Sequence, residues 1–398
     1  MSHEPPRTTD VAIAGGGIMG SAIAYFLLAD PAFDGRVVVV EQDPSYEHCA
    51  AVRSTGGIRQ QWSTPENVDM CQFGAWFFKH VGELLAVGDD VPDIGFKERG
   101  YLFLLDETNA PALERNLEMQ RARGAATLAL DPGELARRFP WLRVDDLVGG
   151  HLGPRDEGWY DPWALLRAFR AKAIALGASY RHDTVVRIAR SGARVTGLTL
   201  ASGARVDADI VVCAAGALGA ARLMATAGLE LPVEPRKRHV YVVDVRGEFP
   251  GFPVTLDTSE VFCRPEGTSF LVALAPRADE PDPACTDREV DHERFERLVW
   301  PRIAHRIPAF EALRMRGAWA CHYDYNVVDQ NAIIGAHPTV ANLLVASGFS
   351  GHGVMQSPAT GRAVAELVTT GGYRSLDLRR FDYARFARGE AVVEGRVY

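Results

Sequence analysis

The sequence lacks the features of disulfide-rich, zinc-binding, membrane-spanning and nucleic-acid-binding proteins. Its six cysteines are scattered through 398 residues without a C-x-x-C pair, so neither a disulfide framework nor a metal site is indicated. A net charge of -8 leaves no basic stripe to replace phosphate counterions. No apolar run reaches the roughly 20 residues of a membrane helix. Residues 1–10 lack the apolar core of a secretory signal, so we expect a cytoplasmic protein.

The length and composition are those of a globular enzyme with two domains. Single hydrophobic cores stop growing near roughly 250 to 300 residues, and this chain exceeds that size. A hydrophobic fraction of 47% supplies ample core, and 38 glycines are typical of nucleotide-binding folds.

A dinucleotide-binding fingerprint lies near the start of the chain. An apolar strand at 10–14 runs into Gly-Gly-Gly-Ile-Met-Gly, which satisfies G-x-G-x-x-G and opens an apolar helix at 18–29. The valine run at 36–40 then indicates a parallel strand buried on both faces. The glycines allow a tight turn and a close approach of main-chain N–H groups to a pyrophosphate, and an acid at the end of the second strand can bind a ribose. The expected contacts are Gly15, Gly17, Ile18, Met19, Gly20, Glu41 and Gln42.

The α/β pattern is interrupted twice along the chain. A helix beginning at 161–162 and strands at 184–188, 195–200 and 210–215 continue it, and it returns at 342–367. Between these stretches, segments such as 239–245 alternate apolar and polar residues, which predicts an antiparallel sheet. We therefore predict a discontinuous Rossmann-type domain (8–80, 155–225, 325–372), an α+β domain on a mixed antiparallel sheet (81–154, 226–324) and a C-terminal tail (373–398).

Four further segments carry a resemblance to a known superfamily. They are Arg53–Gln61, Cys213–Gly216, Asp324–Gly335 and Gly348–Gly353. Together they resemble the D-amino-acid oxidase superfamily, in its branch of sarcosine oxidase, dimethylglycine dehydrogenase and glycine oxidase, over nearly the whole chain. The resemblance implies bound FAD. Gly348–Gly353 would form the C-terminal loop beside the flavin. A helix starting near Pro358 would direct its positive end at the flavin.

The resemblance also implies roles for individual residues. Arg59 and His352 would lie near the flavin ring and act in catalysis. Tyr241, Arg264 and Lys237, on the expected antiparallel sheet, are candidates for binding the substrate. The remaining cofactor contacts would be Ser54, Thr55, Gly57, Val186, Ala215, Gly216, Cys321, Gly351, Gly353, Val354 and Met355.

The chain departs from sarcosine oxidases at two lysines. One is replaced by Met355, and residues 270–274 offer no equivalent of the other. Both departures argue against sarcosine as the substrate and against lysine-assisted reduction of oxygen. The sequence is therefore compatible both with oxygen and with another molecule, such as a quinone, as the electron acceptor.

Cys321 falls where some members of the superfamily attach the flavin through sulfur. Its spacing to Ile333-Ile334 is about one residue longer than in those members. A covalent FAD and a small buried hydrophobic thiol are both compatible with the sequence.

The function that these observations favour is oxidation of the C–N bond of a small amine or amino acid, secondary, N-methylated or of D configuration, by hydride transfer to flavin N5. An alternative comes from residues 56–61, which also resemble the FAD-containing assembly factor of respiratory complex I. The chain would then be a flavin-bearing assembly factor, or a subunit of a larger oxidase or dehydrogenase complex. An oligomer or heteromeric complex is compatible with either function.

Overall fold

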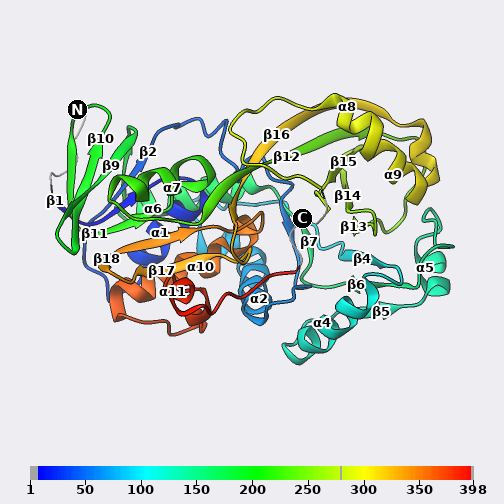
Figure 1. Cartoon of the computed structure of the whole chain (residues 1–398), viewed down its shortest axis with the longest axis horizontal. Helices are drawn as coiled ribbons and strands as arrows, with labels where there is room; N and C mark the ends of the chain where they lie inside the picture. The colour runs from blue at the N-terminus through cyan, green and yellow to red at the C-terminus, as the bar shows by residue number, and fades with distance from the viewer. Residues whose placement is uncertain (1–7, 278–279, 396–398) are drawn as a thin grey trace.

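The computed structural model describes residues 8–277 and 280–395, which build two eight-stranded sheets joined by a two-stranded ribbon (Figure 1). The first sheet has the order β17-β18-β11-β1-β2-β8, and β10 pairs with both β11 and β9. Its strands are β1 (Thr8–Ala14), β2 (Val37–Glu41), β8 (Ser179–His182), β9 (Val185–Ser191), β10 (Arg194–Leu200), β11 (Arg205–Cys213), β17 (Ile333–His337) and β18 (Val340–Ser347).

The centre of this sheet is parallel and buried on both faces. Parallel pairs join β18 to β11, β11 to β1, β1 to β2 and β2 to β8. One face carries the helices α1 (Ile18–Ala29), α2 (Pro65–Lys79), α6 (Pro162–Ala175) and α10 (Gly353–Thr370), whose apolar residues form one core cluster with β1 and β2. The other face carries α7 (Gly216–Thr226) and the β9–β10 hairpin. This is the doubly covered α/β architecture that the fingerprint predicts.

The second sheet is mixed and forms the other half of the molecule (Figure 1). Only the β13–β4 pair in it is parallel among the pairings described. In spatial order the strands are β16 (Arg314–Asn326), β12 (Val233–Asp244), β15 (Ser269–Leu274), β14 (Val261–Glu266), β13 (Val254–Leu256), β4 (Tyr101–Leu105), β6 (Gly149–Gly153) and β5 (Leu128–Leu130). The α/β class with mixed sheets is therefore confirmed, while the boundaries proposed for the two domains stay a prediction.

Short helices surround this second sheet, and a small ribbon links the halves. The ribbon pairs β3 (Gly57–Ile58) with β7 (Gly158–Trp159). The helices are α4 (Ala110–Ala122), α5 (Pro132–Arg138), α8 (His292–Arg294), α9 (Trp300–Arg306), a π-helical turn (Phe295–Val299) and a 3-10 turn (Pro308–Ala312). A further short helix, α3 (Val81–Leu84), packs instead on the core beneath the first sheet. Among the described residues, no helix combines the length and the apolar character needed to cross a bilayer.

The helix after the second glycine loop begins earlier than the sequence indicates. We expected it near Pro358, but α10 begins at Gly353 and contains Pro358 in its second turn. Proline lacks the N–H that would bind the carbonyl of Val354, and the Ser357 hydroxyl donates to that carbonyl instead, at 2.8 Å. The helix therefore starts directly at the glycine loop, which brings its N-terminal N–H groups to the site.

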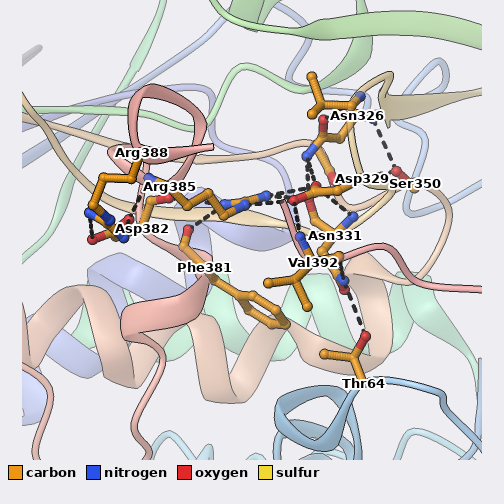
Figure 2. A network of polar contacts seen from close by, with 12 residues as sticks. Thr64, Asn326, Asp329, Asn331, Ser350, Phe381, Asp382, Arg385, Arg388 and Val392 are labelled. Carbon is orange, nitrogen blue, oxygen red and sulfur yellow. Dashed lines mark hydrogen bonds and ion pairs between the residues drawn. The ribbon is translucent and has the colours of Figure 1, made fainter. Parts of the chain in front are cut away.

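The C-terminal tail, with a 3-10 turn (Arg379–Phe381) and α11 (Arg385–Arg388), packs against the turn between β16 and β17 (Figures 1 and 2). The Arg385 guanidinium forms two hydrogen bonds with the Asp329 carboxylate, at 2.8 and 2.9 Å, and neither side chain is exposed to solvent. A buried pair of this kind is tolerated only when both charges are fully hydrogen-bonded, which fixes the tail in one position.

Candidate functional site

Two adjoining cavities run from the first glycine turn to the second sheet. One cavity lies beside β1 and α1, and the other lies beneath β12 and β16. Ser54, Tyr323, Gly351 and Val354 line both. We call the first the dinucleotide groove and the second the ring pocket, because together they have the extended course of a two-part nucleotide.

The first glycine turn leaves no room for side chains. Gly15 has φ +102, and a Cβ at Gly20 would lie 1.9 Å from the carbonyl oxygen of Gly15. The start of α1 at Gly17 has no side-chain cap, so its first N–H groups face the groove. An uncapped helix N-terminus presents donors and a partial positive charge, which is the chemistry that binds a pyrophosphate.

Glu41 borders the same groove from the end of β2. Its carboxylate accepts the Gly16 N–H at 2.7 Å and the Asp43 N–H at 2.8 Å. Burial raises the pKa of Glu41, while these backbone hydrogen bonds lower it. The acid therefore holds the turn and the strand end together at the place where a ribose would lie.

The ring pocket contains a cation packed on an aromatic ring, with a second ring tilted at 59° against the first. The Arg59 guanidinium carbon lies 3.4 Å from the centroid of the Trp62 ring, and the Trp62 and His352 ring centroids are 4.7 Å apart. Burial, together with the Arg59 charge, lowers the pKa of His352 to about 3, so its imidazole is neutral. The buried His352 Nε2 has no hydrogen-bond partner among the described residues, which fits a bound group that contacts it.

The second glycine loop is shaped by two residues at the end of β16. The Asp324 carboxylate accepts the Gly348 N–H at 2.8 Å, and its pKa is raised to about 6 by burial. A Cβ at Gly351, where φ is +99, would lie 2.3 Å from the Tyr323 ring. The loop can thus run against Tyr323 only with glycine at this position, and α10 starts immediately afterwards without a side-chain cap.

The second sheet contributes Arg238 to the wall of the ring pocket. Arg238 pairs with Asp282 through two hydrogen bonds of 2.7 and 2.8 Å, and its guanidinium carbon is 5.0 Å from the centroid of the Tyr323 ring. Opposite it in the β12–β16 register is Cys321, which is buried and also lines the pocket. Burial raises the pKa of the Cys321 thiol to about 11.

Most of the expected cofactor residues border these two cavities. Lining the groove are Gly15, Gly17, Ile18, Met19, Glu41, Gln42, Ser54, Ala215, Gly216, Gly351, Gly353 and Val354. Thr55, Gly57, Arg59, Cys321, His352 and Met355 line the ring pocket. Gly20 acts behind the groove by letting α1 approach β1. Val186 lies apart, because it is 46% exposed on β9 and borders neither cavity.

The three expected substrate contacts do not line the ring pocket. Tyr241 is buried in the core of the second domain, and its hydroxyl donates to the Asp291 carbonyl at 2.6 Å. Lys237, on the same side of β12 as Tyr241, pairs with Asp287. Arg264 donates to the Thr55 carbonyl at 2.8 Å and so supports the loop from behind. Strand residues alternate between two faces, and the sequence does not show which face meets the pocket.

Several pocket residues were missed because they come from unrelated segments. Trp62, Tyr101, Arg238 and Tyr323 were not among the expected site residues, although each borders one or both cavities. As the sequence indicates, no lysine is among the described lining residues of the ring pocket, where Met355, Ala273 and Leu274 lie.

The fold and the paired cavities define a protein of the Rossmann type, a class whose members bind extended dinucleotides. The model of the FAD dependent oxidoreductase (DAO) family matches residues 10–367. The chain belongs to this family, and FAD is its cofactor.

Individual relatives agree with this assignment along nearly the whole chain. FAD-dependent oxidoreductase domain-containing protein 1 of Xenopus laevis is 40% identical, over 99% of this chain and 85% of that protein. Glycine oxidase of Geobacillus kaustophilus is 30% identical, over 90% and 92%. The crystal structure of L-proline dehydrogenase from P. horikoshii superimposes with a TM-score of 0.84 at 28% identity, over 97% of this chain and 100% of that one. The resemblance to the D-amino-acid oxidase superfamily is therefore confirmed, as is the conclusion that the chain is an enzyme.

Proposed function

We propose that the protein oxidises the C–N bond of a small amine that carries a carboxylate, such as a secondary, cyclic or N-methylated amino acid or a D-amino acid. The observation that carries this proposal is the placement of Arg59 and Arg238 in the wall of a pocket that many aromatic and apolar side chains line, alongside the polar residues Arg53, His239 and Glu260. Bound FAD supplies the acceptor, at N5, for the hydride of the substrate carbon.

The charges of the pocket favour both parts of such a substrate. Guanidinium groups bind carboxylates strongly because they donate two parallel hydrogen bonds. Arg238 already holds the Asp282 carboxylate in this way, and a substrate carboxylate would compete for the same guanidinium. Positive charge nearby also lowers the pKa of a bound ammonium group, which favours the neutral amine that can release a hydride.

Aromatic side chains give the pocket its other property, the exclusion of water. Trp62 and Tyr101 are buried, and Tyr323 covers the second glycine loop. The neutral His352 can accept or donate one hydrogen bond at its ring nitrogen without adding charge. The pocket would therefore promote the reaction mainly by orienting the substrate, with few acid–base groups.

The names of two relatives support this class of substrate. One acts on glycine and the other on L-proline, which are both small amines with a carboxylate. The ring pocket lacks a lysine among its described lining residues, which supports an acceptor other than oxygen. We therefore propose a dehydrogenase rather than an oxidase.

An anaerobic titration of the flavin absorbance tests the proposal. Proline and pyrrolidine, or glycine and methylamine, are matched pairs that differ in the carboxylate. We expect at least one carboxylated amine to bleach the flavin faster than its partner, and Arg238→Ala to reduce that preference more than Asp282→Asn. If no amine of either kind bleaches the flavin, the proposal is wrong and the assembly-factor alternative is favoured. Re-oxidation by oxygen and by a quinone analogue then distinguishes oxidase from dehydrogenase.

A further inference from the structure

The short segment Arg59–Thr64 carries two of the side chains of the ring pocket. Arg59 and Trp62 line the pocket, and the segment then enters α2 at Pro65. It has no regular secondary structure, so its conformation depends on contacts made by side chains outside it. Two buried carboxylates, from distant parts of the chain, supply these contacts.

The first carboxylate is Glu157, in the turn before β7. It is 1% exposed, and it accepts the Gln60 main-chain N–H at 2.8 Å and the Gln61 side-chain amide at 2.9 Å. The Gln61 amide also donates to the Tyr101 carbonyl at 2.8 Å, which joins the segment to β4. Arg59 donates in turn to the Gln61 carbonyl at 2.5 Å.

Room for Glu157 is made by a glycine on the second sheet. A Cβ at Gly153 would lie 2.2 Å from the carboxyl carbon of Glu157. Burial raises the pKa of Glu157 to about 7, although the Arg59 charge and the two hydrogen bonds lower it and Asp156 raises it. Burial of a carboxylate costs free energy, and Glu157 fits only because Gly153 has no side chain. We therefore expect the buried carboxylate to have a specific structural role.

The second carboxylate is Glu394, in the C-terminal tail. It is 2% exposed, and it accepts the N–H groups of Ser63 and Thr64 and the Asn67 amide, each at 3.0 Å. It thereby caps the start of α2, where Thr64 itself makes no side-chain cap.

The tail is held at this place by the network of Figure 2, in which Asn331 contacts both Val392 and Thr64. Asn67 extends the network to the start of α10, because it accepts the amide of Gln356 at 2.9 Å, and Gln356 lies in the first turn of that helix. The C-terminal tail is therefore connected by hydrogen bonds to both segments that border the ring pocket.

From this arrangement we propose that Glu157 and Glu394 are positioning residues for the reaction. They hold Arg59–Thr64 from its two ends, so that the guanidinium of Arg59 stays against Trp62 at the wall of the ring pocket. The inference rests on the proposed flavin-dependent reaction, but it concerns the charge presented to the flavin and not the identity of the substrate.

The midpoint potential of the bound flavin tests the proposal without any amine. A positive charge near the ring favours the reduced, more negative flavin, and Arg59→Ala should shift the potential in the negative direction. Removal of the Glu157 charge alone would shift it in the positive direction. If Glu157 acts by positioning Arg59, Glu157→Ala shifts it in the negative direction instead, so the sign of the shift decides between the two effects.

Matched variants separate positioning from general damage. Glu157→Gln keeps one acceptor and should retain most of the wild-type potential, and Asp156→Asn, one residue away, should have no effect. In an Arg59→Ala background, Glu157→Ala should cause no further negative shift, because coupled residues are not additive. Glu394→Ala should behave like Glu157→Ala, with Glu390→Gln in the same tail as its control.

Several results would overturn the proposal. These are a positive shift in Glu157→Ala, an equal negative shift in the presence and absence of Arg59, or an unchanged potential in Arg59→Ala. If Glu157→Ala does not retain FAD, Glu394→Ala decides the question: a shift in the negative direction, toward the potential of Arg59→Ala, supports positioning, and a positive shift contradicts it. A failure of every amine to reduce the flavin would leave these potentials unaffected, so the two proposals fail separately.

Discussion

The two ends of the cofactor site are built by different means. At the pyrophosphate end, main-chain N–H groups and missing side chains do the work: Gly15, Gly20 and the uncapped start of α1 leave space and donors. At the ring end, side chains from distant parts of the chain meet, and Trp62 packs against both Arg59 and His352. We infer that the first end retains the cofactor and the second end adjusts its reactivity.

The largest effect is expected from a side chain at Gly20. The side chain in Gly20→Val would clash with the main-chain carbonyl of Gly15, since even a Cβ would lie 1.9 Å from the carbonyl oxygen. The helix would have to leave the strand, and we expect loss of FAD and of soluble protein. Flavin content after purification and circular dichroism measure the two losses.

Gly17→Ala is the matched control at the same turn. A Cβ there would make an ordinary contact at 3.5 Å with the Cys49 sulfur, so the protein without FAD should keep its thermal stability. FAD binding should still weaken, because the pyrophosphate approaches the main chain there. A variant with unchanged FAD affinity would contradict the proposed course of the cofactor.

At the ring end, Arg59→Ala should reduce catalysis and leave FAD in place. We expect the rate of flavin reduction by the best amine to fall about 100-fold, the effect of removing one charged group that acts in the transition state. Stopped-flow absorbance gives this rate, and the ratio of absorbance at visible and ultraviolet wavelengths gives the FAD content. The rate of flavin reduction should fall less in His352→Ala, because the neutral ring of His352 contributes one hydrogen bond. If Arg59→Ala loses FAD but reduces it at the normal rate, the division of roles between the two ends is wrong.

The same division explains what the sequence could predict. Main-chain geometry demands particular residues at particular spacings, so the glycines, Glu41 and the parallel strands 10–14 and 36–40 were visible as a pattern. The fold class, the family and FAD followed from such patterns and are confirmed. The start of α10 was misplaced because a hydroxyl, at Ser357, replaces the N–H that Pro358 lacks.

The side-chain end could not be predicted in the same way. Arg238 and Tyr323 meet only because β12 and β16 pair over their full length, and no local pattern records that register. Lys237 and Tyr241 were chosen on the same strand, but a shift of one residue changes the face. The strand Tyr101–Leu105 is a continuous apolar run, and such short runs do not reveal their period.

A smaller effect is expected in the dependence of stability on pH. Glu157 has its folded-state pKa raised to about 7, so the folded protein keeps this proton to higher pH than the unfolded chain does. The resulting stabilisation is complete below the unfolded pKa near 4.5 and is lost as the pH rises toward 7, by an amount on the order of 3 kcal/mol at most. Glu157→Gln cannot lose a proton, so its melting temperature should rise relative to wild type between pH 5 and pH 8.

Melting curves at both pH values measure this difference, and Asp156→Asn is the control. The result would identify Glu157 as a carboxyl that is buried at a cost in stability beside the ring end. A difference that is constant with pH would mean that Glu157 has the same pKa in both states, and that its burial carries no such cost.

The smallest effect is expected at Cys321, and it bears on whether the ring end holds its cofactor by contacts alone. Cys321 lines the ring pocket, where a bond from its sulfur to the flavin would tie the ring to β16. The attacking species in such a reaction is a thiolate, whereas burial raises the pKa of this thiol to about 11 and keeps it protonated. We therefore expect the denatured protein to have the mass of the chain without flavin, and Cys321→Ser to retain FAD as the wild type does. An added flavin mass that disappears in Cys321→Ser would show a covalent bond, and the ring end would then retain the cofactor as well as adjust it.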